Sequence, residues 1–200
     1  MEKIGIDQLR PGDIILVAGS SELSKIIEAA ERNDEIQTVG SDTDIAWKES
    51  HGMVVNTINP PIAAEAVANG ICPGDIMKEY YNNPKISSMI CLRTAQAIDP
   101  VQLTAFINQF LNIQKGFFYN LFHGKSHYAF LNLPAFLVYF WTKKHIWLGT
   151  SADNTTSFCC EDFCGFVINH FFPGSFPEHE KTSSIELFYN RIFTEKYIIK

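Results

Sequence analysis

The sequence of 200 residues predicts a single α+β domain spanning 1–200, on two kinds of observation. Short apolar runs bounded by turn residues predict strands at 14–17, 52–56 and 62–67. Apolar stripes at helical spacing predict helices, one after Asp99 and one from Cys160. We therefore expect an antiparallel sheet packed against helices, with a helical, aromatic-rich segment at about 99–148.

The elements of the first third follow from turn and cap signals. Leu9 to Asp13 contain Pro-Gly and predict a tight turn before the first strand. Ser21 is a suitable N-cap for a helix with a short apolar face, and the polar, aperiodic stretch 33–49 predicts a loop. The turn at 59–61 makes the next two strands a hairpin that begins near His51.

The remaining elements are predicted from the same kinds of signal. Residues 71–84 indicate a connection with a short helical turn, and residues 86–93 indicate a further strand. Asp99 and Pro100 begin a helix that Gly116 ends. The tail at 180–200 combines a short helix with a terminal strand.

Composition excludes several classes of function. A net charge of −6 argues against nucleic acid as a partner, because phosphate binding requires clustered lysine and arginine. Five cysteines without even spacing fit reduced thiols, and 159, 160 and 164 are too crowded for a zinc site, so we expect no metal and no cofactor. No signal peptide is evident, and the apolar run 128–141 is too short to span a bilayer. The expected location is the cytoplasm.

Cys160 is the first candidate for chemistry. It stands at the top of an apolar stripe continued by Phe163, Cys164, Val167 and Phe171. A helix start favours negative charge, so a cysteine there can ionise near neutral pH and act as a nucleophile. A lone cysteine in that place is more often a small core residue.

His51 and Glu65 are the candidates that make the thiol significant. His51 stands where a polar loop enters an apolar strand, and Glu65 interrupts the apolar string Ile62 to Val67 of the next strand. A half-buried carboxylate is costly unless something pairs with it. A histidine on the neighbouring strand would pair with it, which predicts a contact between the two side chains.

Short motifs in this order resemble the circularly permuted NlpC-like, papain-fold cysteine hydrolases, which include the YiiX-like proteins and are related to lecithin retinol acyltransferase. The resemblance spans most of the chain and is carried by Leu9-Arg10-Pro11-Gly12-Asp13, Ser50-His51-Gly52, Ala64-Glu65-Ala66, Arg93, Gly116-Phe117-Phe118-Tyr119-Asn120, Cys160-Glu161-Asp162-Phe163-Cys164 and Ser183-Ser184-Ile185-Glu186-Leu187.

The resemblance implies a permuted papain-like fold with Cys160 as nucleophile, His51 as base and Glu65 as the third member of the triad. The family usually has one cysteine followed by a small and an acidic residue, whereas this chain has Cys159 and Cys160 in succession. Cys160 fits the pattern better, with Cys159 as the alternative. Tyr119 is a candidate for lining the substrate site or, equally, a buried aromatic residue.

The predicted function is a cysteine hydrolase that cleaves peptide or N-acyl amide bonds through an acyl-enzyme. An acyltransferase of the lecithin retinol type would use the same intermediate with another acceptor. A different class is a binding module for a lipid or peptide, in which the cysteines are only structural. The expected partners are small peptides, acyl-amides or lipid-like molecules.

Overall fold

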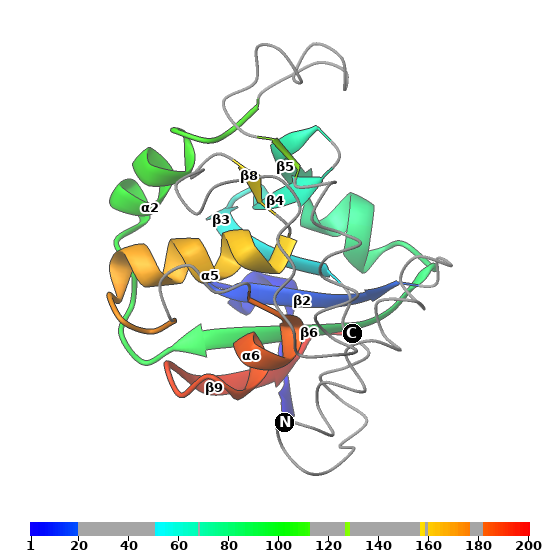
Figure 1. Cartoon of the computed structure of the whole chain (residues 1–200). Helices are drawn as coiled ribbons and strands as arrows, with labels where there is room; N and C mark the ends of the chain where they lie inside the picture. The colour runs from blue at the N-terminus through cyan, green and yellow to red at the C-terminus, as the bar shows by residue number, and fades with distance from the viewer. Residues whose placement is uncertain (20–50, 68, 113–126, 129–156, 159, 177–181) are drawn as a thin grey trace, which may run out of the picture.

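The computed structural model describes residues 1–19, 51–67, 69–112, 127–128, 157–158, 160–176 and 182–200. These ranges form a seven-stranded mixed sheet with few helices, which confirms the α+β class (Figure 1). The strands lie in the order β1-β9-β6-β2-β3-β4-β5. The bounds are β1 Glu2–Lys3, β2 Ile14–Gly19, β3 His51–Ile58, β4 Pro61–Val67, β5 Gly70–Asp75, β6 Ile86–Thr94 and β9 Phe193–Ile198.

Most neighbouring strands are antiparallel, as predicted, including the hairpin of β3 and β4. The exception is β1, which pairs with β9 in parallel and makes the sheet mixed. A separate pair of two-residue strands, β7 (His127–Tyr128) and β8 (Ser157–Phe158), is also parallel. Both parallel pairs join segments far apart in the sequence, so no local turn signal predicts them.

The helical elements are η1 (Ile6–Gln8), the π-helical η3 (Ile76–Tyr81), α2 (Pro100–Ile107), α5 (Cys160–Phe171) and α6 (Ser184–Tyr189). The predicted cysteine helix and the short helix and strand of the tail are confirmed. The helix predicted to continue to Gly116 ends at Ile107. Beyond the helix the chain turns toward β5, where the Asn112 backbone N–H donates to the Ile71 carbonyl at 2.7 Å.

Strand β5 was predicted only as part of a connection, and that prediction was wrong. Its sequence contains Gly70, Pro73 and Gly74, all poor strand formers. Pairing with β4 overrides this local preference, and β5 lies at the edge of the sheet, where proline is tolerated.

Two buried clusters lie on opposite faces of the sheet. Alternate residues of β2 and β3, such as Leu16 and Val54, pack with α2, α5 and α6 in the first cluster. The intervening residues, such as Val17 and Met53, pack in the second cluster with the N-terminal segment and η3. Helix α5 lies across the first face against β3 and β4 (Figure 1).

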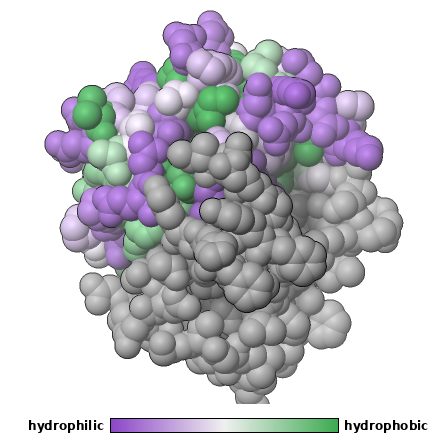
Figure 2. Space-filling model, turned by 90° about the horizontal axis from the view of Figure 1, so that it is seen from above, coloured by the Kyte–Doolittle hydropathy of each residue, from purple (hydrophilic) through white to green (hydrophobic). Residues whose placement is uncertain are grey.

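Polar residues predominate on the described part of the face drawn in Figure 2, with scattered apolar residues among them. Within the described ranges, Met1 and Val101 are the exposed large hydrophobic residues. No helix in the described part of the chain is long and apolar enough to cross a bilayer.

Several predicted elements fall outside the described residues. They are the helix capped by Ser21, the loop 33–49 and most of the aromatic-rich segment at about 99–148, including the apolar run that continues to Trp141. Those predictions stay predictions.

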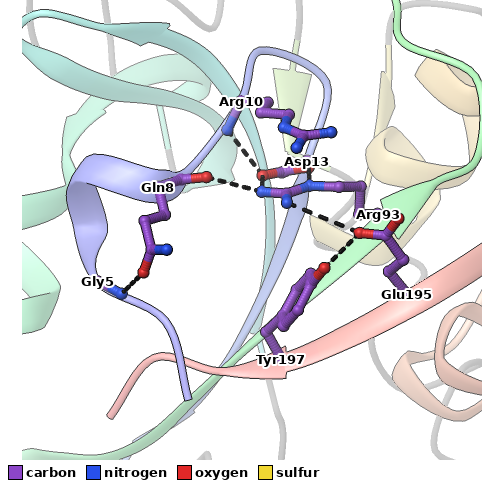
Figure 3. A network of polar contacts seen from close by, with 7 residues as sticks. All are labelled: Gly5, Gln8, Arg10, Asp13, Arg93, Glu195 and Tyr197. Atoms are coloured by element: carbon purple, nitrogen blue, oxygen red, sulfur yellow. Dashed lines mark hydrogen bonds and ion pairs between the residues drawn. The ribbon is translucent and has the colours of Figure 1, made fainter. Parts of the chain in front are cut away.

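A buried ion pair between Asp13 and Arg93 joins the turn before β2 to the C-terminal end of β6 (Figure 3). Arg93 donates through Nε to Asp13 Oδ1 at 2.9 Å and through a terminal nitrogen to Oδ2 at 2.7 Å. Asp13 also accepts the Arg10 backbone N–H at 2.8 Å, and Arg93 donates to the Gln8 carbonyl at 2.9 Å. Glu195 of β9 lies 3.8 Å from the guanidinium. The turn, β6 and β9 are thereby fixed to one another.

Replacing Arg93 by methionine should lower the free energy of unfolding by about 3–5 kcal/mol, because it leaves the Asp13 carboxylate buried without its cation. Urea unfolding measures the change. Arg93→Lys is the matched control, which keeps the charge but loses the two-pronged geometry and should cost less. Equal losses in the two variants would show that the pairing of charge is not what stabilises this turn.

Candidate functional site

His51 and Glu65 contact each other on neighbouring strands. His51 is the first residue of β3, and Nε2 lies 2.6 Å from Glu65 Oε2. The register places Met53 directly opposite Glu65, so the histidine is its diagonal neighbour on the same face. The histidine side chain is 23% exposed and the glutamate side chain 3%. The predicted contact is confirmed, although the pairing is diagonal, and the catalytic role of the pair stays a prediction.

Tyr80 is a third member of this cluster that the sequence analysis missed. Its hydroxyl donates to Glu65 Oε2, and its ring stacks on the imidazole with centroids 5.9 Å apart and planes at 10°. The Tyr80 oxygen also lies 3.4 Å from His51 Nε2. Gly74 of β5 makes room for the carboxylate, because a Cβ there would collide with Glu65 Oε1. Glycines inside a strand are the sequence signal of such a close approach.

The surroundings of His51 favour its protonated form. Burial lowers the pKa of the imidazole, but the hydrogen bond and charge of Glu65, with the more distant charge of Glu161, outweigh burial and raise it above the ordinary value. For Tyr80, burial and the Glu65 carboxylate raise the pKa, which keeps the phenol protonated as a donor. The cluster can therefore hold an imidazolium between a carboxylate and a phenol.

Cys160 is the first residue of α5, and its neighbour Glu161 turns into the protein rather than to solvent. The Cys160 thiol donates to Glu161 Oε2 at 2.8 Å, and Ser184 Oγ of α6 donates to Oε1 at 3.2 Å. The glutamate is 3% exposed and the cysteine 6%. Burial raises the pKa of Glu161 although the thiol bond and the charge of His51 oppose the rise. A buried carboxylate in contact with the thiol was not predicted.

The two clusters meet at the start of β3. Gly52 faces α5, whereas the side chain of His51 lies against Glu65 and Tyr80. A Cβ on Gly52 would lie 3.1 Å from Cys164 Sγ and 3.6 Å from the Glu161 Cα, so helix and strand are in close contact there. The charge of Glu161 acts on His51 and that of Cys160 on Tyr80. The clusters are thus electrostatic neighbours.

Two candidates from the sequence lie outside the described residues. Tyr119, proposed to line the substrate site, and Cys159, the alternative nucleophile, are not placed. Within the described ranges, no three side chains of the metal-binding types come together as a ligand set. The chemistry available in these ranges is that of a thiol, two carboxylates, an imidazole and a phenol.

Comparisons with protein-family models and with curated proteins find no significant match for this chain. An assignment of function has to rest on the site itself.

The contact between His51 and Glu65 makes a prediction for pH. Because Glu65 raises the folded pKa of His51, the stabilisation is fully present below the unfolded value of about 6.5 and is lost as pH rises through the folded pKa. The difference in melting temperature between the wild type and Glu65→Gln should therefore be widest near pH 5–6 and narrow toward pH 9. In the variant, NMR should show His51 titrating at lower pH.

Tyr80→Phe is the matched control for this experiment. It removes a donor from Glu65 but leaves the negative charge, so the titration of His51 should move less than in Glu65→Gln. A His51 titration that is unchanged by Glu65→Gln would contradict the coupling between the two groups.

Proposed function

We propose that the chain is a cysteine hydrolase that cleaves peptide or N-acyl amide bonds, with Cys160 as nucleophile, His51 as acid and base, and Glu65 as the residue that positions His51. The observation that carries the proposal is the 2.6 Å contact between His51 and the buried Glu65, beside the start of the helix that carries Cys160. A carboxylate buried inside an apolar strand is costly unless a cation pairs with it. A protonated histidine is such a cation, and it can act as a general acid.

The proposed reaction proceeds through a thioester. The Cys160 thiol gives its proton to a basic group of the site, and the sulfur attacks the amide carbonyl, forming an S–C bond while the carbonyl electron pair moves to oxygen. The electron pair returns, the C–N bond breaks, and the leaving amine takes a proton from His51. Water then attacks the thioester and gives one proton to His51, the C–S bond breaks, and the sulfur recovers the proton it lost, so that the acid is released and the thiol is restored. The partial positive charge of the helix dipole at the start of α5 favours the anionic sulfur in the first step.

The fold proposed with this function is the permuted papain-like one. The described part of the chain supports it through the order of its elements, because the strand with His51 precedes the helix with Cys160. Within the described ranges Cys72, Cys91 and Cys164 are free thiols, which fits a reducing compartment, and we propose the cytoplasm.

A binding module remains the second candidate, because a specific observation favours it. The Cys160 side chain is buried and its hydrogen is donated to Glu161, as in a structural thiol. A lipid-like or peptide ligand would then bind without reaction. Acyl transfer to an amine or alcohol is a variant of the first candidate, since it shares the thioester.

An activated acyl ester should convert the wild-type protein into an acyl-enzyme, visible as one added acyl mass on Cys160, and an N-acyl amide should be hydrolysed. Cys160→Ala should abolish both, and His51→Gln should lower turnover by about 10²–10⁴-fold because the leaving group loses its proton donor. Product analysis with an added amine separates transfer from hydrolysis.

His170→Gln is the matched control, because His170 stacks on Phe106 and lies outside the proposed machinery. This variant should keep wild-type turnover. An acyl group found on Cys159 would move the nucleophile to that residue, and a wild type that binds the ester without forming any adduct would support the binding module instead.

A further inference from the structure

Glu161 is a buried carboxylate whose hydrogen-bond donors, within the described ranges, are neutral. It is 3% exposed, and it accepts the Cys160 thiol at 2.8 Å and the Ser184 hydroxyl at 3.2 Å. The other buried carboxylates of the described ranges are better compensated, Asp13 by an arginine and Glu65 by a histidine. A buried anion without a cation in contact is costly, and such groups are often kept for a function.

We propose that Glu161 is a catalytic residue that takes the proton from Cys160 when the sulfur becomes nucleophilic. The S–H bond breaks, its electron pair stays on sulfur, and an O–H bond forms on Glu161 Oε2. The inference rests on the proposed function and assigns the first proton transfer of that reaction.

Geometry favours Glu161 over His51 for this step. The glutamate already holds the thiol hydrogen, so transfer needs no rearrangement of side chains. His51 Nε2 lies 2.6 Å from Glu65 Oε2 instead, and Glu65 favours the protonated imidazole, which disfavours acceptance of the thiol proton. Glu161 thereby accepts a proton at the sulfur, and His51 keeps one for the leaving amine.

Charge balance also favours the transfer. Before the transfer the pair is a thiol and a carboxylate, and afterwards it is a thiolate and a carboxylic acid, so it carries one negative charge throughout. Loss of the thiol proton to any other group would leave two anions in contact inside the protein, which is strongly unfavourable.

Some groups around Glu161 raise the pKa of its carboxyl and others lower it. Burial raises the pKa of the carboxyl, which makes it a better acceptor, and the Asp162 charge adds to the rise. Attraction to His51 opposes it. Within the described ranges, the titratable and polar groups that act on the pair are His51 of β3, Tyr80 of η3, Asp162 and Cys164 of α5 and Ser184 of α6, with Glu65 of β4 acting on Cys164.

The test is the pH dependence of Cys160 alkylation by iodoacetamide, with the modified residue identified by tandem mass spectrometry. If Glu161 accepts the proton, the wild-type rate should have a plateau from mildly acidic to neutral pH, because the pair shares one proton over that range. In Glu161→Gln the plateau should vanish, leaving a single rise toward the ordinary thiol pKa of about 8.5, with a rate at pH 6 lowered at least about tenfold.

Three further variants sharpen the result. Glu161→Asp keeps the charge but withdraws it from the sulfur, so it should also lose the plateau, and it replaces Glu161→Gln if that variant does not fold. Ser184→Ala removes a donor that stabilises the carboxylate, so the plateau should persist but begin at higher pH. His51→Gln should keep the plateau, because His51 is not the acceptor.

The opposite results overturn the inference. A carboxylate that merely disfavours the thiolate would make Glu161→Gln react faster than the wild type, and a plateau lost in His51→Gln but kept in Glu161→Gln would make His51 the base. Failure of the proposed function is distinguishable, since a wild type that neither alkylates rapidly nor forms an acyl adduct overturns both proposals. A wild type that forms the adduct, with an unchanged profile in Glu161→Gln, overturns only the role of Glu161.

Discussion

The close contact of α5 with β3 at Gly52 is the constraint on which the candidate site depends. A Cβ at this position would lie 3.1 Å from Cys164 Sγ, so a larger residue would force the helix and strand apart. The contact places the first turn of α5, with Cys160 and Glu161, beside the residue that follows His51. Helix start and strand start then act on each other through their charges.

Around that contact the protein buries two carboxylates, and different groups offset the desolvation cost of each. Glu65 accepts from an imidazole and a phenol, which together provide a cation and a neutral donor. The donors to Glu161 are a thiol, a hydroxyl and its own backbone amide, all neutral, so burial dominates and raises its pKa. The first arrangement fixes a histidine, whereas the second leaves a carboxyl that binds a proton readily, in contact with a thiol.

The sequence predicted what local pattern determines. The apolar strands, the hairpin and the helix from Cys160 follow from periodicity and turns, and the pairing of His51 with Glu65 followed from the cost of a glutamate inside an apolar strand. Tyr80 could not be placed, because its contact depends on β5, a strand with unfavourable residues that forms only by pairing with β4. From the sequence alone, Glu161 is expected to be an exposed acidic residue in the first turn of a helix. Its burial depends on packing against α6, which no local pattern predicts.

The directions of the two pKa shifts assign opposite tasks to the two clusters. The raised pKa of His51 favours the protonated imidazole, which suits a group that protonates a leaving amine. A raised pKa on Glu161 moves a carboxylate that would otherwise be a poor base toward the pH at which it accepts a proton. Acid and base then lie on different elements, so the thiol can be activated without removing the proton that the leaving group needs.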